Sequence, residues 1–358
     1  MGSNPTPSAK KPENHVFSGF LILAVTISML CDIIALTIKI WEVQSMANLF
    51  FRASEDALDN ITDAFDISHP LRVSFRYTRK VLHELTPNTD SFDFNLCHNT
   101  INEDGYVHGV NYRRAFFDTT YEDQEERLAW FLLNNLFAIH EGWAERIYNE
   151  IFYGMGYNKN TFIKYLEYKN ISTKYATYFT PVSKESNILR SAFFSIYQSN
   201  SSLDFSKIDN YMICYRFFKE ARNCYMHKNF IASQKLIDSY NQYQTIASTN
   251  DLDIDEVLVT IPPVLGQRVE LSIRGVIGFS QIIKRIIVIS DTHLLRNKAA
   301  EKEILLRKPA KWRGQTLSSN EARAKGQIAR YFNKSGLLKP LYSDDLKNYL
   351  ISIGVFSK

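Results

Sequence analysis

The sequence predicts a mainly α-helical protein, and its composition and its apolar spacing both point that way. Glycine and proline, the residues that break regular structure, number only 14 and 10 in 358 residues, whereas phenylalanine and tyrosine number 24 and 20. This composition disfavours a turn-rich β-sandwich. Beyond residue 41, apolar residues recur at helical spacing in several segments. With 45% hydrophobic and 22% charged residues, the chain is neither a disordered tail nor a fibrous repeat.

The N-terminal region begins with a polar, proline-containing stretch, residues 1–15, which we interpret as a flexible lead-in. Residues 16–41 are apolar, with Asp32 as the sole charge before Lys39, and about 20 apolar residues suffice to cross a bilayer. We expect a membrane anchor helix here, because of the length and because Trp41 stands close to Lys39. A buried core helix is the alternative, favoured by Asp32, since a carboxylate is costly inside a bilayer. A cleaved signal peptide fits poorly, because the apolar run is too long.

The expected helices follow in order. Amphipathic spacing predicts a helix over 49–65 that ends at the His69-Pro70 breaker, and a second helix over 72–85. Residues 86–122 are rich in Asn, Asp, Thr and Gly, which is typical of a long ordered loop. Further helices are expected at 123–152, 160–170, 185–198, 206–228 and 230–247. Residues 42–250 would thus form one helical domain.

Residues 251–358 differ in character and are expected to form a small mixed module of strands and helices. The β-branched segment 269–290 is compatible with a short strand pair before a helix. Between residues 284 and 339, fourteen Lys and Arg face four Asp and Glu, a net of +10 in a chain whose total is +4. This asymmetry indicates an anionic partner such as RNA, although a solvated basic face explains it equally well. The candidate RNA-binding residues are Lys228, Arg307, Lys308, Lys311 and Arg313.

Several classes of site are disfavoured. The four cysteines, Cys31, Cys97, Cys214 and Cys224, form no CxxC pair, so neither a zinc site nor a disulfide framework is expected. The chain has no phosphate-binding GxxxxGK[ST] loop and no GxSxG elbow. We therefore predict no metal or cofactor, and a cytoplasmic body tethered to the membrane by residues 16–41.

One string carries chemistry: RNCYMH, residues 222–227, near the end of the helix expected at 206–228. It resembles the R-x4-6-H signature of HEPN-domain ribonucleases, including the frequent polar residue directly after the arginine. The resemblance implies a HEPN-like helical bundle and metal-independent RNA cleavage with a 2′,3′-cyclic phosphate product. It also implies a role in antiviral defence, as in abortive infection, or as a toxin, with a partner defence protein or an antitoxin.

Helix geometry constrains how this string can work. At 100° per residue, Arg222 lies at the edge of an apolar stripe and must find a partner or a cavity. Asn223 and His227 lie over one another at i and i+4, on a different face. Because Arg222 and His227 diverge by about 140°, one helix cannot easily bring them together. Two copies around a two-fold axis could do so, which is the arrangement that the resemblance implies.

The residue types suit cleavage of tRNA or mRNA. Histidine can take the 2′-hydroxyl proton or protonate the leaving oxygen, and arginine offers a planar, permanently charged clamp for phosphate. Asn223 could bind a phosphate oxygen or orient the imidazole. Two other functions remain open: a non-catalytic membrane-tethered helical protein, in which Arg222 pairs with a core carboxylate, and an RNA-binding module. The basic segment at Arg72, Arg76, Arg79 and Lys80 could touch RNA phosphate or be a charged helix face.

Overall fold

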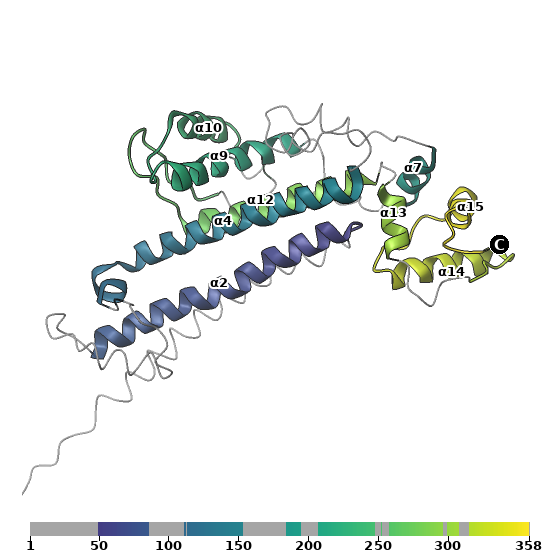
Figure 1. Ribbon diagram of the computed structural model, residues 1–358, viewed down its shortest axis with the longest axis horizontal. Coiled ribbons are helices and arrows are strands. Elements are labelled where there is room, and N and C mark those ends of the chain that lie inside the picture. The colour runs from purple at the N-terminus through teal and green to yellow at the C-terminus, as the bar shows by residue number, and fades with distance from the viewer. Residues whose placement is uncertain are drawn as a thin grey trace, which may run out of the picture. The chain divides into compact units, whose positions relative to one another are not determined.

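The computed structural model describes a mainly helical protein, which confirms the predicted fold class (Figure 1). The described residues are 49–85, 111, 113–152, 184–194, 207–247, 252, 258–295, 299–307 and 315–357. They all belong to one compact unit, Ala47–Lys358. The α-helices among them are α2 (Arg52–Leu85), α4 (Tyr121–Ile147), α7 (Lys184–Leu189), α9 (Ile208–His227), α10 (Gln234–Gln244), α12 (Ile273–Leu294), α13 (Ala299–Leu306), α14 (Glu321–Lys334) and α15 (Asp344–Ser352).

Helix α2 corrects the prediction of two helices separated at His69-Pro70, because it runs unbroken through Pro70. Proline lacks an N–H and disfavours a helix interior, but the pyrrolidine ring faces solvent here. The helix buries residues from Ala53 near its start to Leu82 near its end, and it packs along α4. Tertiary packing over this length therefore outweighs the local cost of the proline.

Helix α4 confirms the helix expected at 123–152 and starts two residues earlier. Thr120 and Asp123 form a capping box, in which each side chain accepts a hydrogen bond from the other residue's backbone amide. A π-helical turn, Tyr148–Phe152, continues the helix. Helix α7 and the π-turn at Arg190–Phe194 correspond to the helix expected at 185–198. Helices α9 and α10 correspond to those expected at 206–228 and 230–247. The helix expected at 160–170 lies outside the described residues.

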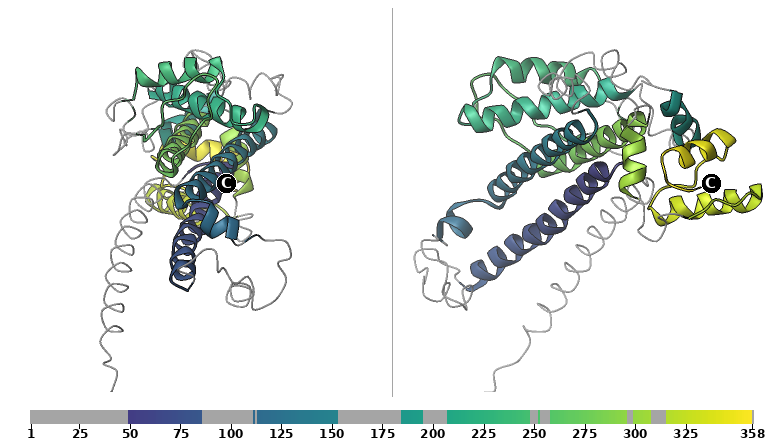
Figure 2. Two further views of the ribbon diagram at one scale, coloured as in Figure 1. Left: turned by 90° about the vertical axis from the view of Figure 1, so that its left-hand side faces the viewer. Right: turned by 45° about the vertical axis from the view of Figure 1, so that its right-hand side comes forward.

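Helix α12 packs against α2, α4 and α9 (Figure 2). Almost all of its described side chains are buried or partly buried. The strand pair expected before this helix is not present among the described residues, where two isolated bridges join Ile231 to Arg268 and Thr316 to Ser357. The described residues on both sides of the predicted boundary at 250/251 belong to the compact unit Ala47–Lys358. A largely apolar, β-branched run fits a buried helix as well as it fits a strand, which explains the wrong prediction of a strand pair.

Two glycines let an extended segment cross α12. A Cβ at Gly275 would stand 2.4 Å from the carbonyl oxygen of Val259, and one at Gly278 would stand 2.2 Å from Leu258 Cδ2. Ser272 Oγ donates to the same Val259 oxygen at 2.9 Å. The two ends of the segment 258–272 are thereby held against α12, and its middle, residues 266–269, pairs with the turn that follows α9.

Helices α13 and α15 pack with α7. Aromatic rings connect α14 to the residues just before α2. Phe193 contacts Phe332 of α14 at a centroid distance of 5.0 Å and Phe50 at 5.4 Å. The amide of Leu341 donates to the carbonyl oxygen of Ala192 at 2.9 Å.

The predicted anchor helix at 16–41 lies outside the described residues. Among the helices that the structure describes, none is both long and apolar enough to span a membrane.

Candidate functional site

Helix α9 carries the RNCYMH string at its C-terminal end. Tyr211, Cys214, Phe218 and Ala221 are buried, as the stripe predicted, and Tyr225 is partly buried at its end. Cys214 and Cys224 are buried free thiols, and burial raises the pKa of Cys214 far above its ordinary value. The apolar face is therefore core, and the string is anchored through it.

Arg222 faces α4, where it finds the partners that its position on the stripe required. Its Nε donates to Asn134 Oδ1 at 3.4 Å, and its Nη1 donates to Glu141 Oε1 at 3.3 Å. The guanidinium also lies 5.5 Å from the centroid of the Phe137 ring. The side chain keeps 24% of its surface exposed. Arg222 is thus a partly open cation rather than a fully buried one.

Asn223 and His227 lie on a different face from Arg222, as helix geometry predicted. His227 is the last residue of α9 and is exposed, and so is Lys228, the C-cap. Asn223 Nδ2 donates to Glu220 Oε2 at 3.5 Å, so this amide contacts its own helix and not the imidazole. One chain alone does not bring Arg222 and His227 together.

The turn after His227 is a feature that the sequence did not reveal. Asn229 and Phe230 both have positive φ, 49° and 68°. Asparagine tolerates this left-handed region, but a bulky residue rarely adopts it. The amide of Phe230 donates to the carbonyl oxygen of Cys224, and the amide of Ile231 to that of Lys228. Such strain persists only where surrounding contacts enforce it, and it is concentrated at functional sites.

Aromatic and charged contacts enforce this turn. The Phe230 ring packs edge-on against Tyr225 at 4.8 Å and Trp130 at 5.8 Å, and Trp130 stacks on Tyr225 at 4.9 Å. The Arg268 guanidinium covers Phe230 at 4.4 Å. Arg268 and the Trp130 indole both donate to Glu126 Oε1, at 3.1 and 3.0 Å. Three elements therefore fix the end of the helix that bears His227.

Arg307, one of the candidate RNA-binding residues, lies in the interior of the protein. Its side chain is 4% exposed, and it is hydrogen-bonded to Glu303 Oε1 at 2.8 Å and to Glu55 Oε2 at 3.0 Å. Although burial opposes the charge, the hydrogen bonds with Glu55 and Glu303 raise the pKa of Arg307. Lys284, in the same basic stretch, is also buried, so part of the +10 charge is internal. Lys308, Lys311 and Arg313 lie outside the described residues.

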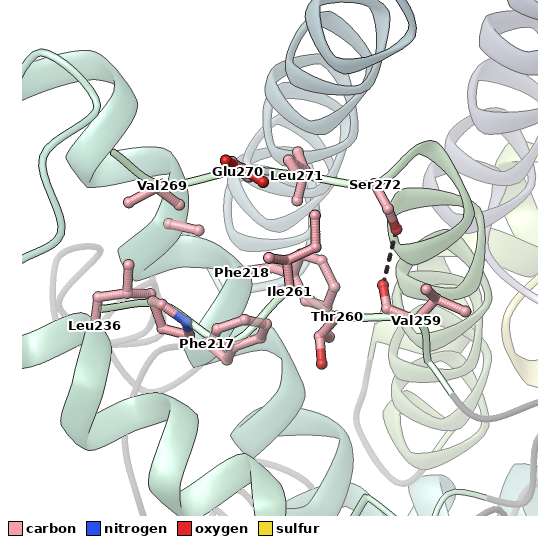
Figure 3. A pocket seen from close by; sticks show the side chains of 12 residues that line it. Phe217, Phe218, Leu236, Val259, Thr260, Ile261, Val269, Glu270, Leu271 and Ser272 are labelled. Carbon is pink, nitrogen blue, oxygen red and sulfur yellow. Dashed lines mark hydrogen bonds between the residues drawn. The ribbon is translucent and has the colours of Figure 1, made fainter. Parts of the chain in front are cut away.

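No group of metal ligands marks a site in the described part of the chain, because its His, Cys, Asp and Glu residues form no group that could hold a metal ion. A cavity of about 10 Å³ lies between α9, α10 and the segment 258–272, with mostly apolar walls (Figure 3). This is the room of roughly one water molecule, so the cavity cannot take a nucleotide.

Comparison with known proteins adds no relative. No family model matches the chain, and searches of curated proteins and of solved structures returned no match.

Proposed function

We propose that the protein is a metal-independent endoribonuclease whose site is completed by a second copy of the chain. The observation that carries this proposal is the fixed end of α9, where strained backbone at Asn229 and Phe230 follows the exposed His227. A rigidly held, solvent-facing histidine is suited to proton transfer, because its geometry is set before the substrate binds.

In this mechanism His227 takes the proton of the ribose 2′-hydroxyl, and the freed oxygen attacks the adjacent phosphorus. The bond from phosphorus to the 5′-oxygen breaks, that oxygen gains a proton from an acid, and a 2′,3′-cyclic phosphate is left. Arg222 stabilises the charge that develops on the phosphorane oxygens. Among the described residues, its Nη2 has no hydrogen-bond partner, so it can donate to phosphate while Nε and Nη1 stay bound to α4.

A second copy is required because Arg222 and His227 face different directions. Two exposed apolar side chains lie at this end of α9, Met226 (52% exposed) and Ile231 (42%), and a third, Phe131 (63%), follows Trp130 in α4. A contiguous apolar surface made of such groups would be typical of an interaction site. A C2 dimer that covered them would bring the ends of two α9 helices together.

The biological role follows from the resemblance alone. A HEPN-like toxin or antiviral nuclease, anchored by residues 16–41 and held inactive by a partner defence protein or an antitoxin, is the setting that we propose for this activity.

A non-catalytic helical protein is the second candidate, and the contacts of Arg222 favour it. Asn134, Phe137 and Glu141 together explain why an arginine stands at position 222 without any substrate. In that case Arg222 only joins α9 to α4, and the membrane tether would be the main property of the protein.

The decisive experiment incubates the full-length protein with total tRNA in EDTA and analyses the ends of the products. His227→Ala is expected to lower cleavage by about 10²–10³-fold, and Arg222→Lys is expected to fail because an ammonium lacks the planar fork. Lys235→Ala, an exposed change on α10, is the matched control. Wild-type cleavage by His227→Ala would overturn the proposal.

Two further variants separate catalysis from structure. Glu141→Gln breaks the same ion pair as Arg222→Ala but leaves the guanidinium in place. We expect Glu141→Gln to retain cleavage and Arg222→Ala to lose it. If Arg222 were purely structural, the two variants would have similar unfolding free energies and would not differ in activity. Mixing Arg222→Ala with His227→Ala chains should restore part of the activity, because a mixed dimer contains one intact arginine and one intact histidine.

A further inference from the structure

We propose that the C-terminal half of α2 and the start of α4 form a second RNA-binding site, which holds backbone phosphates of a single strand. The inference rests on the proposed function in one respect: RNA is taken as the ligand because the protein is proposed to act on RNA. The site itself is independent of the α9 string. Tyr121 and Trp130 are nine residues apart on α4, hence about half a turn around the helix and about 13 Å along it.

The site is an open cavity of about 460 Å³ lined by Arg76, Arg79, Lys80, His83 and Glu84 of α2 and by Tyr121 of α4. Figure 1 shows the end of α2 beside the start of α4. The volume lies in the range of ligand sites. Three permanent cations face one carboxylate, so the lining carries a net charge of +2 with His83 neutral.

The basic side chains form one stripe. Arg76, Arg79, Lys80 and His83 stand at i, i+3, i+4 and i+7, so they share a face of α2 over about 10 Å. Phosphates along one strand of a nucleic acid duplex are about 3.4 Å apart along the axis, so the stripe can reach more than one of them.

Contacts with neighbouring segments of the same chain hold these cations in place without neutralising them. The Arg79 guanidinium donates to the backbone carbonyl oxygen of Thr119, which carries no net charge. The Arg76 guanidinium lies 5.8 Å from the centre of the Tyr121 ring. His83 Nε2 is 3.1 Å from the carbonyl oxygen of Phe116; since a carbonyl only accepts, this nitrogen is the donor. Within the described part of the chain, the one carboxylate paired with the stripe is Glu84, at 3.9 Å from Lys80 Nζ.

The Tyr121 ring in the lining of the cavity favours a nucleic acid strand over a membrane surface as the ligand. Sites for single strands combine a basic groove with rings on which bases stack, and Tyr121 supplies such a ring. The Tyr121 hydroxyl donates to Glu125 Oε1 at 2.9 Å, and Glu125 pairs with Arg72. Arg72 is therefore neutralised by this pair, whereas Arg76, Arg79 and Lys80 are presented to the cavity.

The test measures binding separately from cleavage. The full-length protein is titrated in EDTA with a fluorescent 12-nucleotide 2′-O-methyl RNA, which cannot be cleaved through the 2′-hydroxyl. The affinity is measured between 50 and 200 mM salt for the wild type and for Arg76→Gln/Lys80→Gln. Lys235→Gln/Arg274→Gln removes two exposed cations elsewhere and is the matched control.

We expect the pocket variant to bind more weakly and to lower the steepness of log K against log[salt] by about 1.4, since each phosphate contact on a single strand contributes about 0.7. The control should stay at the wild-type slope. Equal slopes for all three proteins would overturn the inference. So would loss of binding to phosphatidylserine vesicles with RNA binding unchanged, because the pocket would then serve a lipid. Loss of RNA binding with no cleavage by any protein would support this site and reject the ribonuclease.

Discussion

The two ends of helix α2 hold cations in opposite ways. At its N-terminal end, Arg307 is buried between Glu55 and Glu303, and Asp291 of α12 accepts the backbone amides of Phe50 and Phe51 at 2.7 and 3.1 Å. Arg52 donates its amide to Glu303 Oε1 at 3.0 Å. At the other end, Arg76 and Lys80 are exposed beside an open cavity.

The difference follows from what each helix end requires. The first amides of a helix have no partner inside the helix, and where they are buried another element must supply acceptors. Here carboxylates from α12 and α13 do so, and a buried carboxylate in turn requires a cation, which is Arg307. The C-terminal end of α2 reaches solvent, where water solvates its cations, so they need no carboxylate partner. Burial thus decides which arginine is structural and which is available to a ligand.

Arg307→Ala should therefore produce the largest loss of stability. It leaves Glu303, with a side chain only 4% exposed, as an uncompensated buried charge, and breaking such a pair costs about 3–5 kcal/mol. Urea unfolding at pH 7 measures this loss directly. Arg274→Ala, an exposed change on α12, should alter the unfolding free energy by less than about 0.5 kcal/mol. If Arg307→Ala were stable but had lost RNA binding, the result would instead support the RNA contact of Arg307 that the sequence predicted.

His140 tests the buried region in a different way. It lies on α4 beside Trp143, whose indole donates to Ser54 near the start of α2. Neither ring nitrogen of His140 has a hydrogen-bond partner among the residues that the structure describes. Burial lowers the pKa of His140 from 6.5 to about 3. Below pH 6.5 the unfolded chain binds a proton there that the folded chain does not, so stability falls as the pH decreases. His140→Leu should remove this loss.

The size of the effect follows from the two pKa values of His140. At pH 5, below the ordinary pKa of 6.5, keeping His140 neutral in the folded protein costs about 2 kcal/mol of stability. The stability of His140→Leu relative to the wild type should therefore grow by about that amount between pH 8 and pH 5. Asp291 acts with the opposite sign, because burial raises its pKa from 3.8 to about 7, and its contribution increases as the pH falls. The wild type should hence show a flat profile and the variant a profile that rises towards pH 5. If the stabilities of the wild type and of His140→Leu changed in parallel with pH, the pH dependence could not be assigned to His140.

Sequence reasoning predicted local features and missed those set by distant contacts. The helix at 206–228, its apolar stripe and the divergence of Arg222 from His227 follow from periodicity, and the structure has them. The continuity of α2 through Pro70 depends on α4, and the burial of Arg307 depends on two glutamates, one of them 252 residues away. The strained turn at Asn229 and Phe230 depends on Trp130 and Arg268. Except for Glu303, which stands four residues before Arg307, these partners are distant in sequence, so no local pattern signals them.

Arg76→Ala should produce the smallest change in stability, and it completes the comparison between the two ends of α2. Arg76 is exposed, and its contact with the Tyr121 ring contributes about 0.5–1 kcal/mol at an exposed position. Removing its charge also relieves repulsion from Arg79 and Lys80, and alanine favours the helix at least as well as arginine does. The net change in unfolding free energy should stay within about 0.5 kcal/mol in urea. At low salt, the 2′-O-methyl RNA should raise the melting temperature of the wild type more than that of the variant, because a ligand stabilises only the state that it binds. A loss of 2 kcal/mol or more on Arg76→Ala would show that the two ends of α2 use their arginines alike, as structural partners.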